Sequence, residues 1–322
     1  MMAVYTEIGT RDLEAFIASY DIGGLLSSKG IAEGIENSNY LIHTEQAHFI
    51  LTLYEKRVQP EDLPFFLALM HHLADKGVSC PVPVYDRKGN DLRRLAGRPA
   101  AMVTFLEGMS VRRPQVKHCA LLGKAMARMH LAGLDFGLTR PNALSVAGWG
   151  ALLEQSRGHA DEIVPGLAAE METEFAELKA SWPTDLPTGT IHADLFPDNV
   201  FFIGEQLSGV IDFYFACNDL LAYDIAICLN AWCFEEDHEF NVTKARALLN
   251  GYRQVRPLEA REVAALPLLA RGAALRFLLT RAYDWVNTPN DALVKPKDPR
   301  EYVTKMRFHR RIGGAGEYGI DL

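Results

Sequence analysis

The sequence has few cysteines, and none of them is spaced for a metal site or a redox motif. Its 322 residues include five cysteines, an odd number, and no Cys-x-x-Cys pair. All five lie among apolar neighbours: Cys80, Cys119, Cys217, Cys228 and Cys233. This pattern favours buried, reduced thiols in a cytoplasmic protein over a disulfide framework.

Long apolar runs and an excess of positive charge are also missing. No stretch reaches the roughly 18 uncharged apolar residues of a membrane span. The nearest, residues 266–285, is interrupted by Arg271, Arg276 and Arg281. The first residues lack the basic head and apolar run of a signal peptide. The formal net charge of −8 argues against a general nucleic-acid binder, so we expect neither nucleic acid nor membrane as a partner.

The remaining composition is that of an ordinary globular protein. Hydrophobic residues make up 48% and charged residues 23%, and we find no internal repeat and no low-complexity segment. The length leaves room for one large domain or two modest ones, each with its own core.

Residues 1–105 have the pattern of a small antiparallel sheet with one or two helices. Strands are expected at residues 40–42 and 49–54, and an amphipathic helix follows within residues 59–77. Two more strands are expected on either side of a polar turn at residues 87–90. After residue 105 helical patterns dominate, with short strands near residue 190, and residues 313–322 are expected to fray. The sequence therefore predicts an α+β protein of two lobes, 1–105 and 106–322, with a ligand cleft between them.

One polar cluster in the second lobe has the spacing of a catalytic loop. The segment TIHADLFPDNVFF contains His192, Asp194 and Asn199 as His-x-Asp-x₄-Asn, and GVIDF places Asp212 at the end of the next strand. In kinases the Asp of this spacing accepts the proton of the substrate hydroxyl, and the Asn binds a metal ion. Phosphoryl transfer needs both a carboxylate beside the attacking hydroxyl and hard oxygen ligands for Mg²⁺.

Two other interpretations of this cluster stay open. It could be an Asp- and Asn-rich turn in which His192 is buried and bound to backbone. It could also be a metal hydrolase site with His192, Asp194 and Asp212 as ligands. The second interpretation leaves the small sheet lobe without a role.

The chain resembles the aminoglycoside-phosphotransferase-like branch of the protein-kinase-like superfamily, which contains small-molecule kinases. Within that branch it is most similar to the bacterial homoserine kinase family. The resemblance covers roughly residues 30–285 and is carried by these segments: EGIENSNYLI, FILTLYEK, LPFFLALMHHLADKG, CPVPV, HLAGLDF, GTIHADLFPDNVFF and SGVIDFYFACNDLLAYDIAICLNAWC. It implies a two-lobe kinase-like fold and transfer of the γ-phosphate of ATP to an alcohol. For homoserine this transfer is a step of threonine biosynthesis.

The resemblance also implies roles for single residues. Asp194 corresponds to the catalytic base, and Asn199 and Asp212 correspond to the Mg²⁺ ligands. His192 and Asp224 would be structural, holding the catalytic loop. The turn of residues 30–39 would cover the phosphates of ATP, and residues 103–107 would be the hinge beside adenine. The expected nucleotide-binding residues are Gly34, Asn37, Ser38, Thr52, Lys56, Thr104 and Leu106.

One position departs from the family pattern. Thr52 stands where a strand of this fold usually carries a Lys or Arg that contacts the phosphates. Lys56 or Lys29 could supply the missing charge, or Thr52 could offer only its hydroxyl. This departure raises the alternative of a catalytically silent nucleotide-binding protein.

The acceptor site is less defined by the sequence. Homoserine is a zwitterion, so its pocket needs an acid for the ammonium and donors for the carboxylate. Asn218, Asp219 and Asp224 are candidates for the ammonium, with a structural role favoured for Asp224, and Arg276 or Arg281 is a candidate for the carboxylate. An intrahelical ion pair is an equal alternative for Arg276. Trp232 and Tyr214 are expected in the core. Aminoglycosides, choline and hydroxy-amino acids stay open as other acceptors, and the oligomeric state is not predicted.

Overall fold

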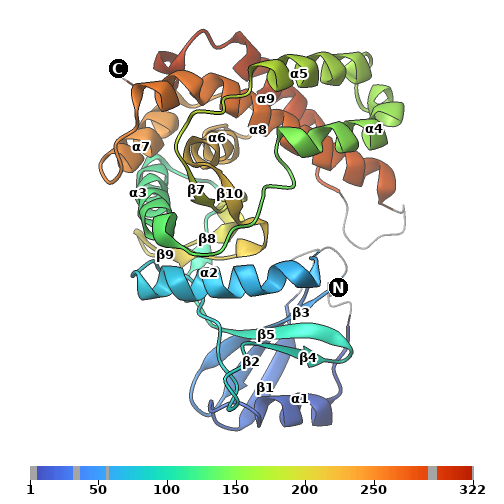
Figure 1. Cartoon of the computed structure of the whole chain (residues 1–322), viewed down its shortest axis with the longest axis vertical. Coiled ribbons are helices and arrows are strands. Elements are labelled where there is room, and N and C mark those ends of the chain that lie inside the picture. Colours follow the sequence, from blue (N-terminus) through green and yellow to red (C-terminus); the bar gives the residue numbers. More distant parts are fainter. Residues whose placement is uncertain (1–5, 32–36, 56–57, 289–295, 321–322) are drawn as a thin grey trace. The chain divides into compact units, whose positions relative to one another are not determined.

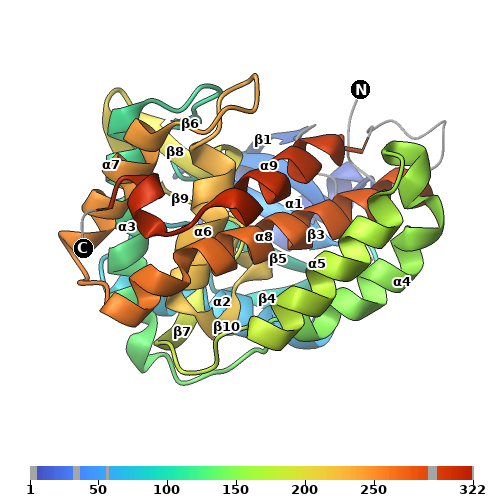
Figure 2. The same cartoon turned by 90° about the horizontal axis from the view of Figure 1, so that it is seen from above.

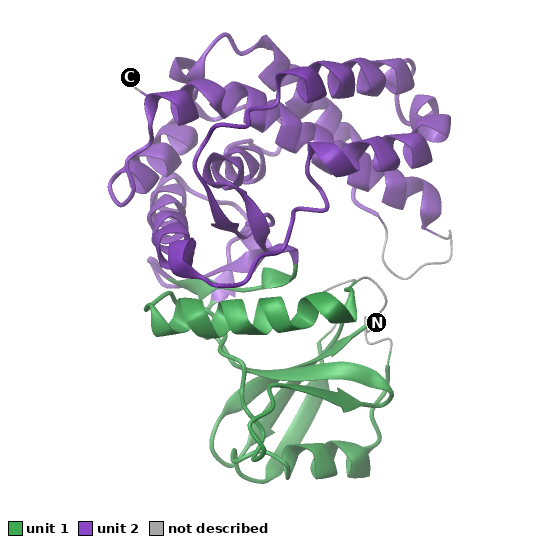
Figure 3. Cartoon of the chain, in the orientation of Figure 1, with its two compact units in different colours: residues 1–108, 208–214 green, residues 109–207, 215–322 purple. Residues whose placement is uncertain are grey.

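The computed structural model describes residues 6–31, 37–55, 58–288 and 296–320. The chain forms two compact units, drawn in green and purple in Figure 3. Unit 1 comprises residues 1–108 and 208–214, and unit 2 comprises residues 109–207 and 215–322. The sequence placed a boundary after residue 105 and did not anticipate that residues 208–214 belong with the first unit.

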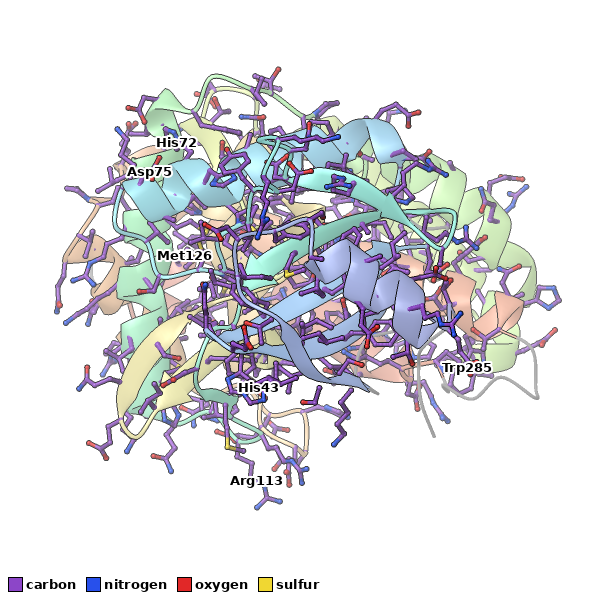
Figure 4. The ribbon with its side chains drawn as sticks, turned by 90° about the horizontal axis from the view of Figure 1, so that it is seen from below. His43, His72, Asp75, Arg113, Met126 and Trp285 are labelled. Carbon is purple, nitrogen blue, oxygen red and sulfur yellow. The ribbon has the colours of Figure 1, made fainter. Side chains whose placement is uncertain are left out.

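Unit 1 is built on an antiparallel sheet with the strand order β1-β2-β3-β5-β4 (Figure 1). Its elements are α1 (Thr10–Ile17), β1 (Leu25–Gly30), β2 (Asn37–Thr44), β3 (His48–Tyr54), the 3₁₀ turn η1 (Pro60–Asp62), α2 (Leu63–Asp75), β4 (Leu92–Leu95) and β5 (Arg98–Thr104). At the β2–β3 turn, the ring of His43, labelled in Figure 4, stacks on His48 at a centroid distance of 4.3 Å.

The two faces of this sheet carry different residues because side chains alternate along a strand. The core that includes Phe16 and Ile17 of α1 takes Leu51 and Leu53 from β3. Thr52 and Tyr54 therefore point to the opposite face of the sheet. That opposite face carries the polar groups described below.

The expected strand before the polar turn of residues 87–90 is wrong. Residues 80–85 form only an isolated bridge, Pro83 with Val103. Pro81 and Pro83 have no backbone N–H and cannot continue a ladder. The two strands lie instead on either side of the turn at Ala96 and Gly97, both of which have positive φ, as β4 and β5.

Unit 2 is mainly helical, so the α+β prediction, with an antiparallel sheet first and a mainly helical remainder, is confirmed. Its helices are α3 (Val116–Ala132), α4 (Val146–Ile163), α5 (Leu167–Ser181), α6 (Leu221–Trp232), α7 (Val242–Arg253), α8 (Ala260–Asn287) and α9 (Arg300–Arg311). Its strands are β6 (Met109–Ser110), β7 (Thr188–Ile191), β8 (Val200–Ile203) and β10 (Cys217–Leu220), and β9 (Gln206–Val210) runs on into unit 1. Short 3₁₀ turns of unit 2 are η2 (Gly133–Asp135), η3 (Pro197–Asn199) and η5 (Ala315–Tyr318), and η4 (Phe213–Phe215) begins in unit 1 and ends in unit 2.

Two glycines let α3 and α7 approach each other closely. A Cβ on Gly123 would collide with the carbonyl oxygen of Leu248, and a Cβ on Gly251 would collide with that of Ala120. The helix backbones are therefore in direct contact, which glycine alone permits without displacement. This contact brings His130 of α3 to Tyr252 of α7, where His130 Nδ1 and the Tyr252 hydroxyl are 2.7 Å apart.

Helix α8 packs beside α6 and α9 (Figure 2). Among the described residues it is the helix with the length and apolar composition of a membrane span, and 67% of its most apolar window is buried in the protein. Its arginines make contacts inside the unit: Arg271 pairs with Glu174, and Arg281 lies 2.6 Å from Glu301. These features are those of a core helix.

The expectation that residues 313–322 fray is wrong for the described part, which ends at residue 320. Tyr318 and Ile320 are buried, and the Tyr318 hydroxyl lies 2.7 Å from His309 Nδ1 of α9. Burial lowers the pKa of His309 to about 3, with a smaller contribution from the charge of Lys305, so the imidazole is neutral in the folded state. The glycine-rich sequence of residues 313–322 suggested fraying and did not reveal the contact of Tyr318 with α9.

Candidate active site

The His-x-Asp-x₄-Asn segment forms a loop between β7 and β8. Residues 192–196 connect the end of β7 to η3, which begins at Pro197 and ends at Asn199. We call residues 192–199 the catalytic loop. His192 is fully buried and Asn199 is 8% exposed, whereas Asp194 is half-buried and Asp198 is exposed. The loop thus presents two carboxylates to solvent, Asp194 partly and Asp198 to a greater extent, while His192 and Asn199 are buried.

A buried carboxylate of α6 binds the start of this loop. The two oxygens of Asp224 accept the backbone N–H groups of His192 (2.9 Å) and Ala193 (2.8 Å). His130 Nε2 lies 3.1 Å from the same carboxylate. Burial alone raises the pKa of Asp224, but the hydrogen bond and charge of His130, together with His192, outweigh it, so the pKa is lowered. The carboxylate is therefore an acceptor at neutral pH.

Two more residues on the same face of α6 contact the catalytic loop. Asp224, Cys228 and Trp232 are spaced by four residues and so lie on one side of the helix. The indole Nε1 of Trp232 donates to the carbonyl of Leu195 at 2.7 Å, and the thiol of Cys228 lies 3.8 Å from that oxygen. Cys228 also touches Met126, which Figure 4 labels on α3. The sequence predicted a core position for Trp232, which is correct, but not this hydrogen bond.

Helix α8 adds one further contact, from Arg276. Its Nη1 donates to the carbonyl of Ala193 at 2.8 Å, and the residue is 3% exposed. Ala193 has a φ of 62°, in the left-handed region. An L-residue with a Cβ costs about 1–2 kcal/mol there, so the surrounding hydrogen bonds must hold it. Ala193 is bound on both sides, through its N–H by Asp224 and through its carbonyl by Arg276.

Asp194 and Asn199 are brought together by the loop. The amide Nδ2 of Asn199 donates to the Asp194 carbonyl (2.8 Å) and lies 3.3 Å from its carboxylate. The backbone N–H of Asp194 lies 3.3 Å from His192 Nδ1. Because its nitrogen is turned to Asp194, Asn199 would bind a cation through its oxygen. Carboxylate and amide oxygens suit Mg²⁺, so the donor chemistry of Asn199 and Asp212 fits such an ion.

Asp212 lies in unit 1, and each unit is described by itself. The residue is exposed and has a φ of 64°, a second left-handed position without glycine. Two residues later Tyr214 accepts a hydrogen bond from the hydroxyl of Tyr54 at 3.0 Å. Burial, with a smaller contribution from the nearby Asp212 carboxylate, raises the pKa of Tyr214 to about 12. Tyr214 is thus a neutral hydroxyl beside Asp212, on the polar face of the sheet.

Thr52 belongs to the same group of hydroxyls. Its Oγ1 donates to Asn39 Oδ1 at 2.8 Å, and it is also hydrogen-bonded to Tyr214. We call Asn39, Thr52, Tyr54 and Tyr214 the strand-face cluster. Thr52 is 3% exposed. At the position where the fold usually has a cation, the chain therefore has an uncharged hydrogen-bonded network.

The other expected nucleotide-binding residues occupy several different environments. Gly34 and Lys56 lie outside the described residues. Asn37 accepts the N–H of Glu55 at 3.3 Å, and fully buried Ser38 donates to the Glu55 carboxylate at 2.8 Å. Lys29 is exposed on β1. At the expected hinge, Thr104 Oγ1 accepts the N–H of Val82 at 2.9 Å, and the Leu106 side chain lies over Gly209. Nucleotide binding by this set stays a prediction.

The expected acceptor-binding residues make contacts within unit 2. Asn218 Oδ1 accepts the N–H of Arg140 at 2.8 Å, and Asp219 Oδ2 accepts Asn142 Nδ2 at 2.7 Å. Burial raises the pKa of Asp219, against the bonds from Asn142 and Leu220. Both side chains thus hold the segment of residues 140–142 against β10. Arg276 is engaged with Ala193 and not in the intrahelical pair that the sequence left open. Acceptor binding by these three residues stays a prediction.

The hydrolase interpretation receives no support from the described residues. They contain no group of three or more His, Cys, Asp or Glu side chains that could hold a metal ion. His192 is fully buried and belongs to the frame of the loop.

The sequence profile described as "Phosphotransferase enzyme family" matches residues 27–258, well over half of the chain. The chain belongs to this phosphotransferase family. A homoserine kinase of Parvibaculum lavamentivorans is 64% identical over 320 residues, covering 99% of this chain and 100% of the relative. A homoserine kinase of Rhodopseudomonas palustris is 63% identical over 322 residues, covering 100% of this chain and 98% of the relative.

A solved structure of this phosphotransferase type supports the fold. An amicoumacin kinase in complex with AMP-PNP, Ca²⁺ and Ami has a TM-score of 0.68 at 16% identity, covering 94% of this chain and 92% of that chain. The predicted kinase-like fold and the predicted family are thereby confirmed. Membership of a phosphotransferase family argues against the hydrolase interpretation, and the catalytic role of residues 192–199 stays a prediction.

Proposed function

We propose that this phosphotransferase is a homoserine kinase, which transfers the γ-phosphate of ATP to the side-chain hydroxyl of L-homoserine. The observation that carries the proposal is 64% identity to a homoserine kinase along the whole length of both chains. The fold likeness to a kinase bound to AMP-PNP supports ATP as the donor. The small zwitterionic acceptor is the only partner that the proposal needs.

Asp194 is the proposed catalytic base. Its carboxylate accepts the proton of the homoserine hydroxyl as that oxygen forms a bond to the γ-phosphorus. The bond from the γ-phosphorus to the β–γ bridging oxygen breaks, and ADP and O-phospho-L-homoserine are the products. The bond from Asn199 Nδ2 to the backbone of Asp194 fixes the distance between the base and the proposed metal ligand.

Asn199 and Asp212 are the proposed ligands of Mg²⁺. When bound, the ion supplies positive charge that offsets the charge on the phosphates. Asn199 is oriented for this role by its own hydrogen bonds to Asp194, and Asp212 is carried at a left-handed position after β9. His192 and Asp224 hold the loop and do not touch substrate in this proposal.

The proposed location is the cytoplasm. All five cysteines are free and buried, as expected for a protein of a reducing compartment. Neither a nucleic acid nor a membrane takes part in the proposed reaction.

A panel of acceptors tests the proposal. ADP release should be measured with L-homoserine, L-serine, choline and an aminoglycoside, and the product with homoserine identified by mass spectrometry. We expect kcat/KM for homoserine to exceed that for each other acceptor by about 100-fold or more, because a site that pairs both ends of a zwitterion rejects acceptors that leave a group unpaired. Equal use of choline or an aminoglycoside would contradict homoserine as the acceptor. Absence of ADP release with every acceptor would indicate a silent nucleotide-binding protein.

A further inference from the structure

Ala193 is held from two helices at once. Its N–H donates to Asp224 of α6 at 2.8 Å, and its carbonyl accepts Nη1 of Arg276 of α8, also at 2.8 Å. The residue has a φ of 62° and directly precedes Asp194. A change of φ or ψ at Ala193 would redirect the Asp194 carboxylate, because the two residues share a peptide group.

The surroundings of Arg276 are unusual for a structural arginine. The guanidinium lies 4.0 Å from the ring centroid of Phe277 and 5.7 Å from that of Phe215. Within the described part of the chain no carboxylate forms an ion pair with it, and its Nε has no hydrogen-bond partner. Burying an arginine in this way is costly, since a buried charge is normally paired. The guanidinium donates instead to the Ala193 carbonyl.

Arg271, five residues earlier on α8, shows the ordinary arrangement. Its guanidinium pairs with Glu174 and Glu177 of α5, and its contacts do not reach the catalytic loop. The two arginines share a helix and are both largely buried, with side-chain exposure of 14% for Arg271 and residue exposure of 3% for Arg276. They differ in what they bind, which makes Arg271 a matched control.

We propose that Arg276 is a positioning residue that locks Ala193 in the left-handed conformation and so aims the Asp194 carboxylate at the acceptor hydroxyl. Its target is the loop backbone, not the carboxylate of the acceptor. The inference rests on the proposed function where turnover is measured. A misaimed base slows the chemical step and leaves binding intact, so the effect belongs to kcat and not to KM.

Two substitutions test the lock. Arg276→Met keeps an unbranched apolar chain beside Phe277 but cannot donate to Ala193, and kcat should fall about 30-fold with KM for ATP and homoserine changed less than threefold. Combining it with Ala193→Gly should restore kcat at least fivefold, because glycine adopts positive φ without being held there. Arg271→Met should lower the melting temperature yet keep kcat within twofold.

Several outcomes would overturn the inference. A tenfold rise in KM for homoserine in Arg276→Met would assign the residue to the acceptor. Unchanged kcat, or no recovery in the double variant, would show that the bond to Ala193 does not aim the base. If Arg276→Met does not fold, Arg276→Leu, which also cannot donate to Ala193, takes its place, and the same recovery by Ala193→Gly is required.

Hydrogen exchange of the loop separates this inference from the acceptor assignment. The amides of His192 and Ala193, which donate to Asp224, should exchange about tenfold faster in Arg276→Met and at the native rate in Arg271→Met. This result needs no acceptor, so it can stand even if homoserine is not phosphorylated. If these amides exchange at the native rate in Arg276→Met, Arg276 does not hold Ala193 in its conformation, whatever the substrate is.

Discussion

The catalytic loop of unit 2 and the strand-face cluster of unit 1 are both largely buried and hydrogen-bonded, yet the first is held by charged groups and the second by neutral ones. The loop is held by charged groups, the Asp224 carboxylate and the Arg276 guanidinium, which bind backbone atoms. The cluster consists of three hydroxyls and one amide, with Thr52 where the fold usually has a cation. Charged groups bound to backbone fix a conformation, whereas a neutral network fills a position without supplying charge.

The comparison predicts where substitutions should be most damaging. Every chemical role proposed for the loop depends on the direction of one carboxylate, and that direction depends on buried bonds. The strand-face cluster is expected to matter for the stability of unit 1 more than for turnover. Three substitutions test this contrast, beginning with the largest effect.

Asp194→Asn should have the largest effect. It keeps the size of the side chain and removes its ability to accept a proton, so kcat should fall by about 10³-fold or more. Binding of ATP, measured by titration calorimetry, should change less than threefold because the nucleotide does not depend on the base. Asp198→Asn, in the same loop but exposed beside Lys297, is the control and should keep kcat within twofold. An equal loss of kcat in the two variants would show that Asp194 is not the catalytic base.

Asp224→Asn should have the second largest effect, because it removes a group that holds the catalytic loop and leaves the proposed base, Asp194, in place. An amide can accept only one of the two backbone N–H groups and turns its own NH₂ toward the other. We expect the free energy of unfolding at pH 7 to fall by about 3 kcal/mol and kcat to fall as the loop loosens. Urea unfolding followed by circular dichroism measures the free energy of unfolding, and ADP release measures kcat.

The pH dependence of this loss has a definite sign. The folded pKa of Asp224 is below the ordinary value, so its contribution is fully present above the unfolded pKa of about 4 and is lost as the pH falls through the lower folded value. The variant does not titrate at this position. The difference in unfolding free energy between the two proteins should therefore shrink below about pH 4. A difference that is constant with pH would mean that Asp224 is not a charged acceptor in the folded state.

The two regions also differ in how far the sequence could predict them. The His-x-Asp-x₄-Asn spacing predicted that Asp194 and Asn199 lie together, because the two residues are only five positions apart, and their hydrogen bond agrees with this, while their catalytic role stays a prediction. Asp224 was predicted as an anchor through the family resemblance alone. The bonds from Trp232 and Arg276 were missed because they join residues 37 and 83 positions apart. The spacing of Asp224, Cys228 and Trp232 along one helix face was the available signal for the first of these.

In unit 1 the sequence showed the absence of a cation at Thr52 but not what replaces it. The replacement depends on the register that sets Asn39 opposite Thr52 and on the return of residues 208–214 to the first unit. Neither is a local property of the chain. The strand that the sequence predicted at residues 80–85 is wrong for the same reason, because strand pairing is not a local property. Alternating Val and Pro suggest a strand, but only tertiary pairing decides whether a ladder forms.

Thr52→Val should have the smallest effect and is the most direct test of the neutral network. It removes a hydroxyl that binds Asn39 and Tyr214, so the free energy of unfolding should fall by about 1 kcal/mol, with KM for ATP changed less than threefold. Thr190→Val on β7 is the matched control, because the buried Thr190 hydroxyl has no hydrogen-bond partner among the described residues. Its removal should be neutral or slightly stabilising. A tenfold rise in KM for ATP in Thr52→Val, with stability unchanged, would instead assign the Thr52 hydroxyl to the nucleotide and make the strand face part of the active site.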